Sequence, residues 1–122
     1  MAEILIVDDD DVIRDTLYEL LSANYECDSA STAEKALSKL EQETFDVVVT
    51  DISMPGLSGV ELLSWVLKYY PKTPVIIVSG ISDLEHAERL LKLGAFDYLL
   101  KPFRLEVVET SVKRALEYRR AQ

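Results

Sequence analysis

The chain has 122 residues, of which 48% are hydrophobic and 29% charged. That length suits one domain with a buried core. The formal net charge of −9 argues against direct binding of nucleic acid or of an anionic membrane surface by this domain. We therefore expect residues 1–122 to form one globular domain, whose charge suits the binding of cations.

The cysteine content and the N-terminus bear on the cellular compartment. The single cysteine, Cys27, cannot form a disulfide within the chain, which fits a reducing cytosol. The apolar run near the N-terminus has no basic region before it and is too short for a signal peptide. No apolar stretch approaches the length that crosses a membrane. We expect a cytoplasmic protein.

The first third of the chain predicts two strands and two helices. Residues 4–7 form a continuous apolar run, typical of a strand buried on both faces, and four aspartates at positions 8–11 follow it. Acidic residues suit the start of the next helix because they cap its free N–H groups. Residues 25–30 predict a weaker, peripheral strand. A capping box over residues 31–34, with Ser31 as the cap, opens the second helix.

The middle of the chain contains the stretch on which the functional interpretation depends. A strand is predicted over residues 45–51, in which residues 47–50 form an apolar, β-branched run that ends abruptly in Asp51. A turn marked by Pro55 and Gly56 follows, and residues 58–61 have the spacing of a second capping box. Asp51 is therefore expected at the carboxyl end of a central strand, the edge at which open α/β sheets bind ligands.

The last third of the chain predicts two further strands and two further helices. They cover residues 74–79, 82–94, 97–101 and 105–120 in turn. A third capping box, from Ser82 to Glu85, opens the first of these helices. The strands end in Ser79 and Lys101, so a hydroxyl and an ammonium group follow apolar runs. His86 lies in a charged helical stretch and is expected to be exposed.

Five strands that alternate with five helices indicate a doubly wound α/β fold. Such a chain forms a parallel sheet with helices on both faces, joined by right-handed crossovers. The first and third strands carry the strongest apolar runs that end in acid, so we place them side by side. The predicted strand order is 2-1-3-4-5, which makes the domain a flavodoxin-like three-layer sandwich.

Polar groups that follow four of these strands are expected to converge on one pocket. The residues are Asp8, Asp9, Asp51, Ser79 and Lys101. Carboxylates held together repel each other, by roughly 3 kcal/mol for a pair ~5 Å apart at an effective dielectric constant near 20. A hard divalent cation such as Mg²⁺ relieves this repulsion. A lysine beside the cation can neutralise the oxygens of a transferring phosphoryl group.

Each of these residues also has a purely structural interpretation. Asp10 and Asp11 suit a solvated helix start, Lys101 suits a surface lysine whose stem is buried, and Ser79 suits a turn at a strand end. The functional interpretation is favoured because the four strand ends carry complementary chemistry.

Several short motifs resemble those of the receiver domain of two-component response regulators, and the resemblance covers the chain from end to end. The matching pieces are Ile6-Val7-Asp8-Asp9, Asp51-Ile52-Ser53-Met54-Pro55-Gly56 with Gly59, Val78-Ser79-Gly80, Gly94-Ala95 and Tyr98-Leu99-Leu100-Lys101-Pro102-Phe103. In this order and spacing the motifs are highly specific.

The resemblance implies a role for each site residue. Asp51 is the phosphoacceptor. Asp8, Asp9, Asp51 and the backbone carbonyl of Ser53 hold Mg²⁺ or Mn²⁺. Lys101 contacts the phosphoryl oxygens, Ser79 binds one of them after transfer, and Tyr98 turns inward as Ser79 moves. The Lys101–Pro102 peptide bond is expected to be cis.

The resemblance also implies partners. A sensor histidine kinase or a phosphotransfer protein supplies the phosphoryl group. The face formed by the fourth helix, last strand and last helix switches to control an output domain or partner, and it offers a surface for a homodimer. The C-terminal stretch looks most like receivers that precede AAA+ transcriptional activators. Both an excised domain and a stand-alone regulator fit this sequence.

Three other functions share features with this sequence. A phosphatase of the haloacid-dehalogenase type needs an acid two residues after its nucleophile, where this chain has Ser53, so an independent enzyme is not expected. A flavodoxin-like FMN carrier needs a phosphate loop where this chain has four aspartates. The alternative kept open is a pseudo-receiver, a protein-binding module that is never phosphorylated, although such modules usually lack Asp51 or Lys101.

Overall fold

Five strands and five helices alternate along the chain in the computed structural model, which describes residues 1–122. The strands are β1 (Glu3–Val7), β2 (Glu26–Ala30), β3 (Val47–Asp51), β4 (Val75–Ser79) and β5 (Asp97–Leu100). The helices are α1 (Asp11–Ser22), α2 (Ala33–Gln42), α3 (Gly59–Tyr69), α4 (Leu84–Leu93) and α5 (Leu105–Arg120). All strand pairs are parallel and their order is β2-β1-β3-β4-β5. The predicted fold and strand order are confirmed.

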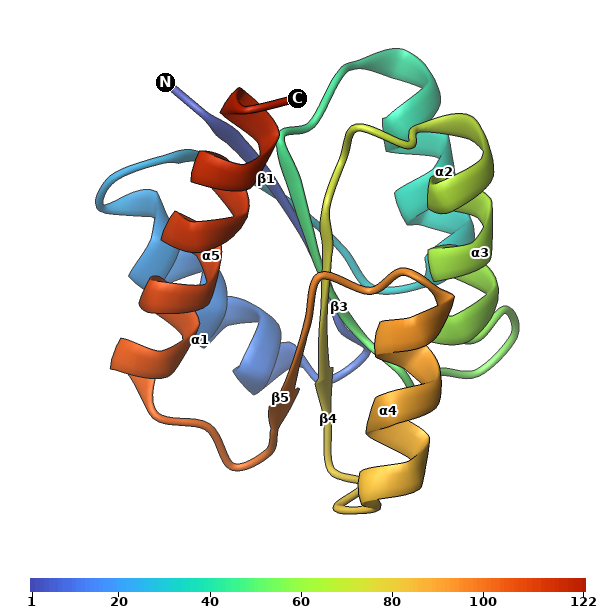
Figure 1. Ribbon diagram of the computed structural model, residues 1–122. Coiled ribbons are helices and arrows are strands. Elements are labelled where there is room, and N and C mark those ends of the chain that lie inside the picture. The colour runs from blue at the N-terminus through green and yellow to red at the C-terminus, as the bar shows by residue number, and fades with distance from the viewer.

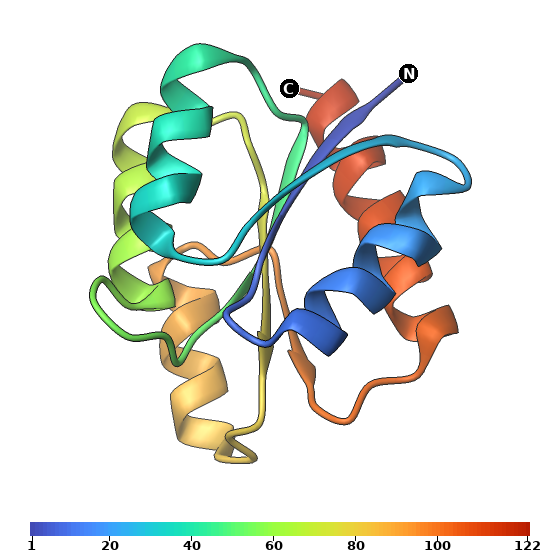
Figure 2. The ribbon, with the colours of Figure 1, turned by 180° about the vertical axis from the view of Figure 1, so that it is seen from behind.

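The helices form two layers, one on each face of the sheet. Helices α1 and α5 cover one face, and α2, α3 and α4 cover the other (Figure 1). The same two layers are seen from behind in Figure 2. Both chain ends lie at the edge of the sheet where the strands begin, opposite the edge where β3, β4 and β5 end. The two layers leave that second edge to the connecting loops.

Alternation along the strands divides the core in two. In β1, Ile4 and Ile6 belong to the cluster beneath α1 and α5, whereas Leu5 and Val7 belong to the cluster beneath α2, α3 and α4. Successive strand residues point to opposite faces, so a strand between two helix layers must be apolar at every position. This explains why β1, β3 and β4 contain continuous apolar runs and do not alternate with polar residues.

The helix starts confirm one of the three predicted capping boxes. Ser58 accepts a hydrogen bond from the Glu61 N–H, and the Glu61 carboxylate accepts one from the Ser58 N–H. In the other two cases the predicted caps were wrong by one residue. The caps are Thr32 and Asp83, whose side chains accept from N–H groups of the first turn. Adjacent residues of equal capping ability are distinguished only by the path of the incoming chain.

The bounds of the strands lie within two residues of the predicted ones. The predicted strands over 45–51 and 74–79 begin one or two residues late in the structure, and Lys101 lies just beyond β5. The Lys101–Pro102 peptide bond is cis, as expected. No helix combines the length and the apolar character needed to cross a membrane.

Candidate functional site

The predicted site residues lie together where the strands end. Asp8 directly follows β1, Asp51 ends β3, Ser79 ends β4 and Lys101 follows β5. Because β1, β3, β4 and β5 are parallel neighbours, their carboxyl ends share one edge of the sheet. Asp8 is 1% exposed, Ser79 0% and Asp51 7%. Burial of so many polar groups in one place is costly unless they bind one another or a ligand.

Three carboxylates form the centre of the site. Asp8, Asp9 and Asp51 each offer one oxygen, and these oxygens lie within 4.8 Å of one another. Asp8 and Asp51 are buried, whereas Asp9 is exposed and its carboxylate makes no hydrogen bond or ion pair. An all-oxygen set of this kind, open to solvent on one side, fits a hard cation that keeps some of its water.

The carboxylate of Asp8 is held in place on both oxygens. Oδ2 lies 3.0 Å from Lys101 Nζ, and Oδ1 accepts a 2.9 Å hydrogen bond from the Asp10 N–H. Its backbone carbonyl accepts a 2.9 Å bond from Nη1 of Arg14 in the first turns of α1. Arg14 is not among the predicted site residues, and it reaches Asp8 because of the angle at which α1 leaves β1.

Lys101 connects the two buried acids. Its Nζ lies 3.0 Å from Asp8 Oδ2 and 3.4 Å from Asp51 Oδ1, and its backbone N–H donates to the Ser79 carbonyl at 2.7 Å. Burial alone would lower the pKa of Lys101, but the hydrogen bond and charge of Asp8 and the charge of Asp51 raise it above its ordinary value. Lys101 is therefore a fixed positive charge inside the site.

The two oxygens of Asp51 have different surroundings. Oδ1 accepts a 2.8 Å bond from the Ile52 N–H and faces Lys101. Oδ2 accepts no hydrogen bond, and no buried side-chain oxygen or nitrogen in the structure lacks a partner, so Oδ2 reaches solvent. Burial and the charge of Asp8 raise the pKa of Asp51, although Lys101 opposes them. Asp51 thus combines a fixed oxygen with a free one.

The loop after β3 packs tightly on Asp51. The Gly59 N–H donates to the Ile52 carbonyl at 2.9 Å. A Cβ atom at Gly59 would lie 2.1 Å from the Asp51 carbonyl oxygen, so only glycine fits there. Ser53, the predicted backbone ligand, lies exposed in this loop two residues after Asp51.

Ser79 and Tyr98 meet at the loop between β4 and α4. Ser79 Oγ accepts from the Ile81 N–H at 3.0 Å, and the Tyr98 hydroxyl donates to the Ile81 carbonyl at 2.8 Å. His86 Nδ1 lies 3.2 Å from the same hydroxyl. The expectation that His86 is simply exposed was wrong, because the ring is partly buried beside Tyr98. Tyr98 therefore lies beside the site and outside the acidic cluster.

Asp10 and Asp11 match their structural interpretation. Asp10 caps α1 by accepting from the Val12 and Ile13 N–H groups, and Asp11 pairs with Arg14. Neither belongs to the group of three carboxylates. Of the four consecutive aspartates, the first two therefore face the site and the last two start the helix.

Comparisons with known proteins agree with this geometry. The sequence profile of the response regulator receiver domain matches residues 4–113. The transcriptional regulator NtrC of Salmonella typhimurium is 38% identical over 118 residues, which cover 96% of this chain and 25% of that protein. The response regulator FleR of Pseudomonas aeruginosa is 35% identical over 93% of this chain and 24% of its own length. This chain spans about a quarter of the length of these relatives.

Solved structures show the same likeness. A receiver domain protein from Clostridium thermocellum superposes with a TM-score of 0.93 and 33% identity, covering 99% of this chain and 98% of that one. NtrX from Brucella abortus superposes with a TM-score of 0.90 and 33% identity, covering 99% of this chain and 28% of that one. The fold, the convergent strand ends and the sequence matches agree, and the chain belongs to the response regulator receiver domain family.

Proposed function

We propose that this domain accepts a phosphoryl group on Asp51 from the phosphohistidine of a sensor histidine kinase or phosphotransfer protein. The observation that carries this proposal is the state of the Asp51 carboxylate. Oδ1 is fixed by the Ile52 N–H, while Oδ2 is unbonded and reaches solvent beside Lys101 and two further acids. A nucleophile needs such a positioned but unpartnered oxygen.

The transfer is a single displacement at phosphorus. The Asp51 carboxylate oxygen forms the new O–P bond while the N–P bond of the donor breaks and its electrons return to the imidazole. Negative charge spreads over the three equatorial oxygens of the phosphoryl group. Lys101 Nζ, already held between Asp8 and Asp51, is placed to stabilise that charge without reorganising.

The donor set fits Mg²⁺ or Mn²⁺. Asp8, Asp9, Asp51 and the Ser53 carbonyl would hold the ion, which when bound supplies charge neutralisation at the phosphoryl oxygens. Asp8 is oriented for this by Lys101 and the Asp10 N–H. Asp9 is exposed and unbonded, so it is free to become a ligand.

Ser79 and Tyr98 change position when Asp51 is phosphorylated. Ser79 Oγ accepts from the Ile81 N–H and donates no hydrogen bond of its own, so its hydrogen is available to a phosphoryl oxygen. Movement of Ser79 pulls on Ile81, which Tyr98 also binds. The surface of α4, β5 and α5 is thereby shifted toward a second arrangement, as a change of population.

The surface of α4, β5 and α5 would control an output. We propose an output domain or a partner protein as its target and a homodimer through the same face as one of its states. The relatives of the chain are longer regulators of which it spans about a quarter, which supports a role as the input part of such a protein. Its chemistry would be confined to its own phosphorylation and dephosphorylation, because the position two residues after Asp51 is Ser53 and no second acid follows.

Intact-mass measurement after incubation with Mg²⁺ and acetyl phosphate tests the proposal. We expect one labile phosphoryl adduct, lost with a chelator and absent from Asp51→Asn. Asp11→Asn is the matched control, because Asp11 lies nearby but outside the carboxylate group. This variant should be phosphorylated to the same extent as the wild type. A folded wild type that binds Mg²⁺ but never carries an adduct would point to the pseudo-receiver.

A further inference from the structure

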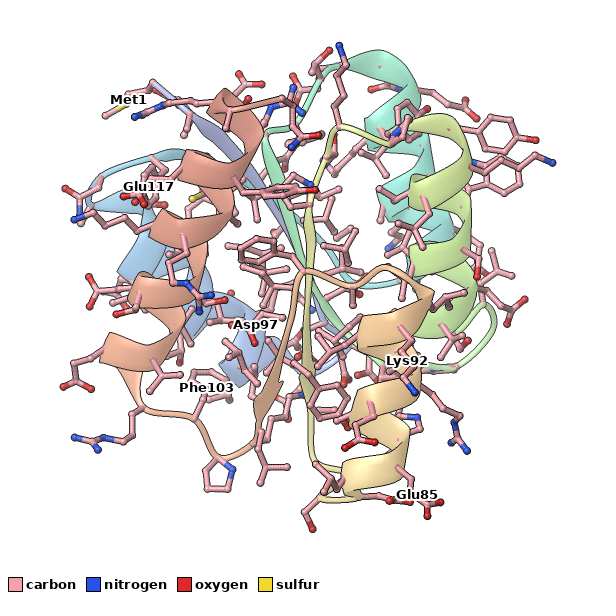
Figure 3. The ribbon with its side chains drawn as sticks, viewed as in Figure 1. Met1, Glu85, Lys92, Asp97, Phe103 and Glu117 are labelled. Atoms are coloured by element: carbon pink, nitrogen blue, oxygen red, sulfur yellow. The ribbon has the colours of Figure 1, made fainter.

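The single histidine of the chain contacts the tyrosine that we assign to the switch. His86 lies in α4 and Tyr98 in β5, and Nδ1 of His86 is 3.2 Å from the Tyr98 hydroxyl oxygen. The two rings meet edge to face, with centroids 5.9 Å apart and planes inclined by 81°. The contact joins α4 to the sheet on the surface that the proposed function uses. Glu85 marks the start of this helix and Lys92 its last turn in Figure 3.

Counting hydrogens determines which atom donates in this contact. The Tyr98 hydroxyl has one hydrogen, and it is used in the 2.8 Å bond to the Ile81 carbonyl, which has no hydrogen to offer. The bond between His86 and Tyr98 therefore needs a hydrogen on Nδ1. A neutral imidazole carries its hydrogen on one nitrogen only, and a free side chain in water favours Nε2. The geometry requires the less common neutral tautomer or the imidazolium.

We propose that His86 is a positioning residue for Tyr98, donating Nδ1–H to the hydroxyl and so fixing the tyrosine in the position that holds Ile81. This inference rests on the proposed function, since it assigns His86 to the regulation of the same switch. With the hydrogen on Nε2 instead, Nδ1 would accept the tyrosine hydrogen and compete with the Ile81 carbonyl. The position of the hydrogen on the His86 ring thereby decides how firmly Tyr98 binds the Ile81 carbonyl.

The surroundings leave few other groups to control this ring. The charged residues within one helical turn of His86 are the N-cap residue Asp83 and, in α4, Glu85, Glu88 and Arg89. The adjoining surface hollow is lined by Tyr98 and Leu100 together with Ile81, Ser82, Asp83, Leu84 and Ala87. Its titratable residues are Tyr98 and Asp83, and the Asp83 carboxylate accepts a hydrogen bond from the Glu85 N–H. Among these side chains, Tyr98 is the one that forms the contact with the His86 ring.

Nitrogen NMR of the labelled chain tests the contact directly. One histidine gives one pair of ring nitrogen signals, so the assignment is unambiguous. We expect Nδ1 to be protonated in the neutral wild-type ring and Nε2 to be protonated in Tyr98→Phe, with Tyr118→Phe behaving as the wild type. Protonation at Nε2 in the neutral wild type would overturn the inference, whether or not the domain is phosphorylated.

The regulatory part is tested on phosphorylated samples. The amide shifts of residues 81–84 report the ratio of molecules in which Tyr98 binds the Ile81 carbonyl to molecules in which it does not. In His86→Leu we expect this ratio to fall about fivefold, the factor that corresponds to one ordinary hydrogen bond. His86→Asn, whose amide can donate near the place of Nδ1, should restore it. An unchanged ratio in His86→Leu would overturn the regulatory role. Intact mass of the same samples reports Asp51 phosphorylation, so failure of the proposed function appears separately as an absent adduct.

Discussion

Ser79 and Tyr98 bind opposite ends of one backbone residue. The Ser79 oxygen accepts from the Ile81 N–H at 3.0 Å, and the Tyr98 hydroxyl donates to the Ile81 carbonyl at 2.8 Å. Ser79 ends the strand beside Asp51, while Tyr98 lies beneath α4. Any displacement of Ser79 toward the site therefore disturbs Ile81 and with it the tyrosine. Ile81 therefore connects the end of β4 beside Asp51 to the surface of α4.

Removal of the Tyr98 hydroxyl should weaken this connection measurably. Tyr98→Phe keeps the ring but loses the bonds to Ile81 and His86. We expect the free energy of unfolding to fall by about 1 kcal/mol, the usual net value of a hydrogen bond. Urea unfolding measures it. Tyr118→Phe is the control, because the Tyr118 side chain is exposed and makes no hydrogen bond; an equal loss there would contradict the account.

Asp51 should destabilise the metal-free domain at neutral pH. Burial and the charge of Asp8 raise its pKa in the folded state, so the folded state binds the proton more tightly than the unfolded chain. The contribution of protonated Asp51 to the free energy of unfolding is present at low pH and is lost as pH rises through the raised pKa. Asp51→Asn should therefore be more stable than the wild type at pH 7 in chelator, and its stability should change less across the acid range. A less stable variant would contradict this explanation.

Mg²⁺ should stabilise the folded domain. An ion bound by the folded state alone stabilises it, by about 2.7 kcal/mol at a hundred times the dissociation constant. Thermal unfolding of the wild type should therefore shift upward with Mg²⁺, and Asp9→Asn, which removes an exposed ligand, should shift less. Asp11→Asn, outside the carboxylate group, should shift as the wild type. Equal shifts for Asp9→Asn and the wild type would remove Asp9 from the ligand set.

Gly59 should be intolerant of a side chain. A Cβ there would lie 2.1 Å from the Asp51 carbonyl oxygen and 2.6 Å from Ile52 Cα, so the backbone on either side of the phosphoacceptor must move. We expect Gly59→Ala to cost about 1–3 kcal/mol of stability, as overpacking does, and to slow phosphorylation. Gly80→Ala is the control, because nothing lies within 4 Å of the added atom. Equal stability of the two variants would show that the loop after β3 adapts.

Arg119 should hold the end of α5 against the sheet. Its Nε donates to Asp46 Oδ1 at 2.9 Å and its Nη1 to the Lys72 carbonyl at 2.6 Å. Asp46 in turn accepts from the Glu3 N–H. We expect Arg119→Ala to lower the free energy of unfolding by about 1–2 kcal/mol, allowing for partial exposure of the pair. Arg120→Ala, an exposed neighbour without such bonds, should change it little, and a similar loss in both would disprove the specific role.

Strand order and site location followed from the sequence because each depends on local patterns. The apolar runs before Asp8 and Asp51 mark parallel strands buried on both faces, and parallel strands bring their carboxyl ends to one edge. Ser79 and Lys101 could be added for the same reason. An error of one or two residues in the predicted strand bounds does not change which polar residue follows the apolar run.

Contacts between distant side chains could not be predicted in this way. Arg119 reaches Asp46 only because α5 packs back over the sheet. Arg14 reaches the Asp8 carbonyl because of the angle at which α1 leaves β1. His86 carries no local signal for a contact with Tyr98, since the helical stretch around it is rich in charged residues and the face it presents to the sheet is set by packing. Asp97, labelled in Figure 3, is a similar case: it is the first residue of β5, and its carboxylate accepts a 2.7 Å hydrogen bond from the Ser111 hydroxyl of α5. These contacts depend on tertiary geometry, which periodicity does not contain.

The central claim, that Asp51 is the phosphoacceptor, is tested most directly by mapping the modified residue. Borohydride converts an aspartyl phosphate into homoserine, which tandem mass spectrometry locates in a peptide. After incubation with Mg²⁺ and acetyl phosphate we expect homoserine at position 51, and unchanged aspartate at positions 8 and 9. Homoserine at position 8 or 9 with an unmodified Asp51 would contradict the claim.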